Sequence, residues 1–440
     1  MDSGTRSARA AMPREIYALF VVRLVVSAGS FVGPFLAMML TLKLGYDEAG
    51  AGAFMSAVSV VSALGLVLGG KLGDTFGRAA VLRNLQAATA AIFLVCAAAG
   101  FTVATPFLIA LAMGTLSGSW PVINALVADH APPDRRKEAF SLLYWGNNIG
   151  FSIGPLVAGF LFNAAPRILF VGNAVVLLAA AATVTLFVDR HGAKPAESGT
   201  DLGSAATPGT ELETAAARGT ELDPAATPGT ELDGRPTTLW SVMRANPVLL
   251  LFGLAQILTA FVYNQHTFAL PVFLADSLGA EAGPRAYGMV MTTNGLTVVV
   301  LTAFVTWVSR RLPSLAAVAG ASVFYAVGFG AYWFVGGLPV ALGATALWTV
   351  GEILGATNSN AFIAERAPPA HRSRVNSAIS LCHIVGNAAA PLAAGPLAKA
   401  LGSRAVWPFV AVLALASAAS MAWVHRFDMR RNGTGAGKAA

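Results

Sequence analysis

The sequence is poor in charged residues. Asp, Glu, Lys and Arg make up 12% of its 440 residues, whereas hydrophobic residues make up 55% and the mean hydropathy is +0.64. A water-soluble domain contains about 25% charged residues, so this composition excludes a soluble protein. Crossing a bilayer takes roughly 20 residues of helix, because no backbone polar group can stay unpaired in lipid. The apolar runs are long enough to do so.

Several kinds of chemistry are missing as well. The two cysteines, Cys96 and Cys382, lie in apolar runs and predict inert buried thiols rather than a disulfide framework. Outside the apolar runs there is no Gly-x-x-x-x-Gly-Lys-Ser/Thr phosphate loop, no metal-ligand spacing and no nucleophile–His–acid set. We therefore expect no enzyme activity, no cofactor and no metal site. The net charge of +7 is dispersed over loops, which argues against a nucleic-acid partner.

The apolar runs predict an all-α membrane protein with twelve transmembrane helices in two six-helix halves. The expected domains are an N-terminal half (1–189), a linker (190–245) and a C-terminal half (246–440). The linker repeats a ten-residue unit rich in Gly, Pro, Thr and acidic residues, which cannot bury enough surface to fold. We expect a tether, with a regulatory or partner-binding role as the alternative. The twelve spans are expected at 16–41, 50–70, 80–101, 104–127, 139–163, 167–188, 247–275, 284–309, 313–336, 338–363, 374–400 and 404–425.

Lys and Arg are distributed unevenly among the loops. If both termini are cytoplasmic, 23 of the 29 basic residues fall in inner loops and tails and five in outer loops. The positive-inside rule therefore predicts cytoplasmic termini. The first apolar run is too long for the core of a signal peptide and is expected to remain as helix 1. We expect a multi-pass monomer in the cell membrane.

The two halves share a repeat with an offset of 236 residues. Residues 124–159 and 360–395 align without a gap and share Asn, Pro-Pro, Arg, Ser, Gly and Pro positions. In each copy an apolar helix ends, a charged Pro-Pro loop follows and a Gly-rich apolar helix begins. Duplicated hydrophobic halves are typical of transporters in which one half rocks against the other around a central site.

The segment between the second and third spans reads Gly-Lys-Leu-Gly-Asp-Thr-Phe-Gly-Arg over residues 70–78. Gly70, Asp74, Gly77 and Arg78 match the G-x-L-x-D-x-x-G-R signature, so the chain resembles the major facilitator superfamily. The resemblance implies a loop that latches the outward-facing state through Asp74 and Arg78, and Asp129 is expected to pair nearby. A solvated turn with one ion pair is the alternative. The equivalent segment 307–313 lacks the Asp and the Gly.

The fifth span contains a glycine series that ends in a Gly-Pro pair. Its residues are Gly146, Gly150, Gly154, Pro155 and Gly159. Glycines three to five residues apart allow another helix to approach closely, and generic packing is one explanation. The series also resembles the antiporter motif of drug–proton exporters. The fourth span lacks the Arg that many of those exporters have, so proton coupling would need another buried group.

Glu352 is the best candidate for that group. It lies about 14 residues, or roughly 21 Å, into its span, and an ionisable group at such depth is expensive and by default functional. A purely structural counter-ion is the alternative. Arg23, about eight residues into the first span, is the second buried charge and the second candidate for proton coupling. The alternative is that its side chain extends to the interface, which an Arg can reach from that depth.

Further polar residues are expected to line a central cavity. His266 titrates near neutrality when unperturbed, although a lone buried His is more often a packing residue. A break at Pro271 is expected to follow Tyr263–His266. The expected cavity residues are Trp120, Asn147, Asn148, Tyr263, Gln265, His266 and Asn294.

These features predict a transporter that exports hydrophobic or amphipathic small molecules, such as drugs or natural products, by proton antiport. Its partners would be the small-molecule substrate, protons and the lipid bilayer. The first alternative is a proton-coupled uptake symporter for a peptide or sugar, and the second is a membrane sensor or scaffold without transport.

Overall fold

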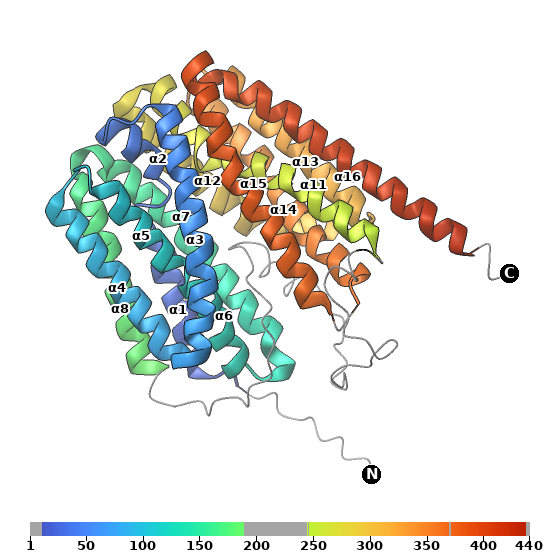
Figure 1. Cartoon of the computed structure of the whole chain (residues 1–440), viewed down its shortest axis with the longest axis horizontal. Coiled ribbons are helices and arrows are strands. Elements are labelled where there is room, and N and C mark those ends of the chain that lie inside the picture. The colour runs from blue at the N-terminus through green and yellow to red at the C-terminus, as the bar shows by residue number, and fades with distance from the viewer. Residues whose placement is uncertain (1–10, 189–243, 245, 369–370, 437–440) are drawn as a thin grey trace, which may run out of the picture.

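The computed structural model describes residues 11–188, 244, 246–368 and 371–436, and within these ranges it is helical with no strand (Figure 1). The predicted linker, 190–245, lies almost wholly outside the described residues. The first six spans are built from α1 (Arg14–Ala28), α2 (Leu36–Met38), η1 (Met39–Lys43), α3 (Glu48–Phe76), α4 (Arg78–Ala99), α5 (Thr105–Ser117), α6 (Ser119–His130), α7 (Arg136–Ala164) and α8 (Pro166–Phe187). The last six are built from α11 (Pro247–Tyr263), η4 (Asn264–His266), α12 (Ala269–Ser309), α13 (Ser314–Ala331), η5 (Tyr332–Phe334), α14 (Leu338–Arg366), α15 (Arg372–Leu401), η7 (Ser403–Ala405) and α16 (Val406–Ala436).

The described helices account for the twelve predicted spans. Nine helical stretches are long and apolar enough to cross a membrane. One of them, Pro247–Ser309, contains two spans that meet at Gly279, where φ is +87°. The set is completed by α7 and by the broken first span, α1 with α2 and η1. The protein is therefore a multi-pass membrane protein with two six-helix bundles.

Two local predictions are wrong. Residues 70–76 do not form a loop but the last turns of α3, and the whole turn is made by Gly77, where φ is +90°. Glycine adopts this backbone conformation without strain. In the seventh span the break falls at 264–268 rather than at Pro271. Pro271 lies in the first turn of α12, where the amides have no partner within the helix, so a proline costs no hydrogen bond there.

The first span breaks at the equivalent place, between Ala28 and Leu36. Backbone amides released by the break need partners because no water reaches them in lipid. The side-chain oxygen of Asn173 on α8 accepts hydrogen bonds from the amides of Phe31 (3.0 Å) and Val32 (3.1 Å). The break is therefore a satisfied part of the fold.

The two bundles approach each other most closely at one end, at the top of Figure 1, which we call the far end. There α7 packs on α12, and α3 packs on α15. A Cβ atom on Gly288 would fall 2.5 Å from the carbonyl oxygen of Pro155, and one on Gly159 would fall 2.6 Å from that of Pro284. Gly52 is equally tight against Pro391, and Gly395 against Glu48.

These contacts repeat with the same 236-residue offset as the sequence. Gly52 corresponds to Gly288, and Gly159 corresponds to Gly395. Between them, the Ser56 hydroxyl donates to the carbonyl of Ala388 and the Thr292 hydroxyl donates to that of Ser152, both over 2.7 Å. The far end is thus closed by two equivalent helix pairs.

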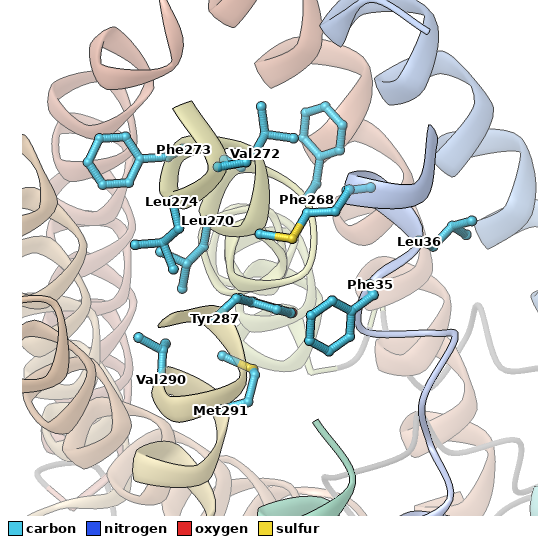
Figure 2. Packing of buried hydrophobic residues seen from close by; sticks show 14 of the residues in the cluster. Phe35, Leu36, Phe268, Leu270, Val272, Phe273, Leu274, Tyr287, Val290 and Met291 are labelled. Carbon is cyan, nitrogen blue, oxygen red and sulfur yellow. The ribbon is translucent and has the colours of Figure 1, made fainter. Parts of the chain in front are cut away.

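Aromatic packing fills the space between the two pairs. The ring of Phe35, from the break in the first span, meets the edge of Tyr287 on α12 with ring centroids 5.1 Å apart, as Figure 2 shows. Phe35 also packs on Phe162 of α7, with centroids 5.6 Å apart. All three side chains are buried, so this cluster joins both bundles at the far end.

Replacing Gly52 with Ala should force the bundles apart at the far end. The added methyl group would overlap the backbone of Pro391, which cannot move aside, and such overpacking costs about 1–3 kcal/mol. The distance between spin labels on Val103→Cys and Leu401→Cys, in a background without Cys96 and Cys382, should therefore increase. Gly343→Ala, which meets open space, is the matched control. An unchanged distance distribution for Gly52→Ala would contradict this account of the closed end.

An exposed ion pair should add a small, salt-sensitive contribution to closure. Lys399 donates to Asp47 across the two bundles at 2.7 Å, and this hydrogen bond, with one from the Gly50 amide, holds the pKa of Asp47 below its usual value. Because that pKa is lowered, the contribution is present above about pH 4 and is lost as the pH falls further. With the same labels, Lys399→Gln should slightly lower the closed population at pH 7. The difference from the unsubstituted protein should shrink in high salt and at pH 3. A difference that survives both conditions would mean that Lys399 acts by packing instead.

Candidate functional site

Glu352 lies at the midpoint of α14, 14 residues or about 21 Å from either end. Its two oxygens accept different hydrogen bonds. Oε1 accepts from the Tyr263 hydroxyl and Oε2 accepts from Nδ2 of Asn294, both at 2.7 Å. No Lys, Arg or His nitrogen of the described chain lies within 4.0 Å of this carboxyl group. Neutral donors therefore hold it, and it can gain or lose a proton without breaking an ion pair.

Two further groups support this arrangement. Nδ2 of Asn294 also donates to the hydroxyl of Thr349, one turn before Glu352 on α14, at 3.0 Å. The Tyr263 ring meets Trp348 edge-on, with centroids 6.2 Å apart. Trp348 and Thr349 are fully buried, whereas Glu352, Tyr263 and His266 are partly exposed. The carboxyl group is thus reachable on one side and rigidly backed on the other.

The break at 264–268 places this site next to the far-end cluster. Nδ1 of His266 bonds the carbonyl of Tyr263 at 2.6 Å, and its ring stacks on Trp348 with centroids 5.6 Å apart. The carbonyl of His266 accepts from the Tyr287 hydroxyl at 3.2 Å. Since Tyr287 packs on Phe35, a continuous series of contacts leads from Glu352 to the opposite bundle.

Three other predicted cavity residues make their hydrogen bonds to different partners. Asn147 accepts from the Ser27 hydroxyl at 2.9 Å, between α7 and α1. Asn148 donates to the carbonyl of Tyr144 in its own helix. Gln265 is fully buried and bonds the carbonyl of Phe261. The structure therefore brings together Glu352, Tyr263, Asn294 and His266. Asn147, Asn148 and Gln265 make no hydrogen bond to this group.

Arg23 is separate from Glu352. Its side chain is 3% exposed, and its guanidinium carbon lies 3.2 Å from the centre of the Trp120 ring on α6. No carboxylate of the described residues lies within 4.0 Å of it. The two buried charges do not form an ion pair, so the structure places them in different surroundings within different bundles.

The glycines of α7 divide between two neighbours. Gly146, Gly150 and Gly154 lie against α1, where a Cβ atom would overlap Phe20, Leu24 or Ala28. Gly159 instead lies against α12 of the opposite bundle, and the carbonyl of Pro155 lies against Gly288. The motif therefore joins α7 to its own bundle on one face and to the far-end contact on the other.

The residues of the predicted latch do meet. Arg78 donates to both oxygens of Asp129 on α6 at 2.6 Å and to Asp74 on α3 at 3.1 Å. Gly70 lies near Pro121 of α6. All of these partners belong to the first bundle. At the equivalent place in the second bundle, Ser314 donates to Glu365 at 3.0 Å, so a neutral donor replaces Arg78.

Sequence reasoning missed several participants. Thr349, Trp348 and Tyr287 support the site or link it to the far end, yet they read as ordinary apolar or small polar residues of a span. Ser56 and Thr292 could have been found, because the 236-residue offset pairs them. The described residues contain no group of three His, Cys, Asp or Glu side chains that could hold a metal ion.

Twelve spans in two related bundles, with a carboxyl group held at mid-depth, define a membrane transporter rather than an enzyme. The Major Facilitator Superfamily model matches residues 18–391 and 284–439. The chain belongs to the major facilitator superfamily.

Similar proteins support the same class. A "Na(+), Li(+), K(+)/H(+) antiporter" of Planococcus maritimus is 25% identical over 422 residues, covering 91% of this chain and 93% of that protein. An uncharacterised transporter of the superfamily from Bacillus subtilis (strain 168) is 22% identical over 372 residues, covering 82% and 80%. Among solved structures, an auto-inhibited POT family peptide transporter has a TM-score of 0.73 at 17% identity, covering 94% and 97%. At that identity the likeness shows the fold alone.

The contacts of Arg78 predict different outcomes for its two partners. Asp74→Asn should change the melting temperature by no more than about 2 °C, because Arg78 keeps Asp129 and exposed pairs contribute little. Asp129→Asn should lower it further, because the closer partner of Arg78 is lost. If Asp74 and Arg78 latch the outward-facing state, Asp74→Asn should nevertheless reduce proton-coupled flux in liposomes. Normal flux in Asp74→Asn would exclude a latch role for this residue.

Proposed function

We propose that the protein exports a hydrophobic or amphipathic small molecule across the cell membrane in exchange for protons, by alternating access. In this proposal the halves 1–189 and 246–440 rock about the central site and both termini are cytoplasmic. The observation on which it rests is Glu352, a carboxyl group at mid-depth held by neutral donors and without a cationic partner among the described residues. Such a group can bind either a proton or a cationic substrate.

Competition for one carboxylate supports exchange rather than joint movement. A proton and a cation cannot both neutralise Glu352, so binding of one favours release of the other. The substrate that fits this chemistry carries a positive charge or a strong hydrogen-bond donor next to an apolar body. Tyr263 and His266 offer partly exposed aromatic faces beside the carboxyl group, and aromatic faces attract cations.

The contacts beyond Glu352 offer a route from protonation to rocking. Tyr263 donates a hydrogen bond to Glu352, and the adjacent break at 264–268 contacts Tyr287, which packs on Phe35 at the far end. A ligand shifts a two-state equilibrium only by its differential binding to the two states. A change of about 1.4 kcal/mol in the hydrogen bonds of Glu352 would shift the populations tenfold.

A second candidate is exchange of an alkali cation for protons. The Planococcus maritimus relative is named as a Na⁺, Li⁺, K⁺/H⁺ antiporter. Oxygen atoms of Glu352 and Thr349 both lie within 3.0 Å of Nδ2 of Asn294, and hard cations take oxygen ligands. Uptake of a nutrient by proton symport is the third candidate. The direction of the pH gradient that drives substrate accumulation distinguishes symport from both forms of exchange.

The decisive experiment uses liposomes that contain the purified protein and a pH-sensitive dye in an acidic lumen. External ethidium, or Na⁺, Li⁺ or K⁺, should make the lumen more alkaline if protons leave in exchange for the added cation. Glu352→Gln should abolish this response, because the amide cannot release a proton. Glu281→Gln, which changes an exposed carboxylate of the same bundle, is the matched control and should respond normally.

Each outcome identifies one mechanism. A response to ethidium alone supports small-molecule export, and a response to alkali ions alone supports the second candidate. Labelled substrate that accumulates only in liposomes with an alkaline lumen indicates symport. A full response in Glu352→Gln would refute the role of Glu352 whichever substrate is used.

A further inference from the structure

We propose that the first bundle contains a binding site for a monovalent anion, either a free inorganic ion or a carboxylate group of a substrate, centred on Arg23. The guanidinium of Arg23 is buried, and its Nε atom makes no hydrogen bond to any described residue. Its guanidinium lies over the face of the Trp120 ring, and a buried charge that lacks an anionic or hydrogen-bonding partner costs several kcal/mol. Nothing in the export mechanism proposed above uses this group, so the inference stands apart from it.

Other unpaired polar groups lie on α6, which contacts α1, and on α4, which contacts α6. Gln86 on α4 is fully buried, and neither its side-chain oxygen nor its nitrogen has a partner among the described residues. The hydroxyl of Ser119, next to Trp120 on α6, is buried and unpaired as well. Buried polar groups are nearly always hydrogen-bonded. Three such exceptions on α1, α4 and α6 indicate that a ligand completes their bonding.

At the equivalent position in the second bundle, the buried polar side chains are hydrogen-bonded to one another. There Thr259 and Ser322 both bond the hydroxyl of Ser417, at 2.8 and 3.1 Å. With the 236-residue offset, the equivalents of these three residues are Arg23, Gln86 and Ala181. We infer from this correspondence that Arg23 and Gln86 flank Ala181, whose methyl group cannot serve as the central hydrogen-bonding group.

No carboxylate of the described residues lies within 4.0 Å of the Arg23 guanidinium. The helices α1, α4, α6 and α8 contain only two carboxylates, Glu15 and Asp129. Glu15 is eight residues from Arg23, or about 12 Å along α1, and Asp129 is held by Arg78. We infer that the anion comes from solution. The guanidinium lies against the Trp120 ring, which is only partly buried.

The chemistry of the three groups suits a small monovalent anion. Arg offers donors only, in a planar fork that fits a carboxylate. The amide of Gln86 and the hydroxyl of Ser119 can add one donor each. A chloride ion or a carboxylate group would accept these bonds and neutralise the buried charge.

The test is the melting temperature of the purified full-length protein in chloride, propionate or methanesulfonate at equal ionic strength. The unsubstituted protein should show a saturable increase of about 1–3 °C in at least one of the first two salts relative to methanesulfonate. Arg23→Gln should remove this increase. Arg285→Gln, which removes an exposed positive charge, is the matched control and should retain it.

The salts distinguish the two sources of the anion. Stabilisation by chloride indicates a free inorganic ion, whereas stabilisation by propionate alone indicates the carboxylate of a larger ligand. If Arg23→Gln does not fold, Arg23→Lys replaces it, and the increase should then saturate at a higher anion concentration. Identical melting temperatures in all three salts, or an unaltered increase in the Arg23 variants, would overturn the proposal. Neither outcome depends on Glu352 or on proton coupling.

Discussion

A polar group that leaves water must find a partner inside the protein, and most of this structure follows from that requirement. Each break in a helix leaves backbone amides and carbonyls without helical hydrogen bonds. Side chains of neighbouring helices then bond these backbone groups. Asn173 does so for the break in the first span, and Tyr287 does so for the break in the seventh. Glu352 obeys the same rule through Tyr263 and Asn294. Among these groups, the Glu352 carboxyl group is the one that can also gain or lose a proton.

The architecture could be predicted because it depends on length and apolar character. Twelve runs of sufficient length predict twelve spans, and the repeat at 124–159 and 360–395 predicts two related bundles. The boundaries were less accessible. A Gly-rich, charged stretch such as 70–76 resembles a loop, yet helical geometry continues until Gly77, where only glycine fits the turn. Likewise, Pro271 looks like a helix breaker but sits where a proline is tolerated.

The site was only partly predictable for a different reason. Glu352 stands out because a carboxylate is rare at mid-span, and Tyr263 and Asn294 could be suggested as polar neighbours. Which polar residues converge depends on the rotation and tilt of each helix, and a single sequence does not specify either. Asn147 and Gln265 looked equally suitable but face helix contacts instead. The role of Tyr287 depends on packing between bundles, which no local pattern encodes.

The contacts that close the far end also bear on how the molecule assembles. Ser56 and Ala388 are 332 residues apart in the chain, and Ser152 and Thr292 are 140 apart. Contacts inside a bundle also connect distant residues, as between Thr259 and Ser417, which are 158 apart. Each bundle is nevertheless one continuous stretch of chain, so the first can pack before the second has been synthesised. We expect each bundle to acquire its helices before the two meet. The surfaces at the far end would then be the last to form during biogenesis and the first to separate when the protein is destabilised.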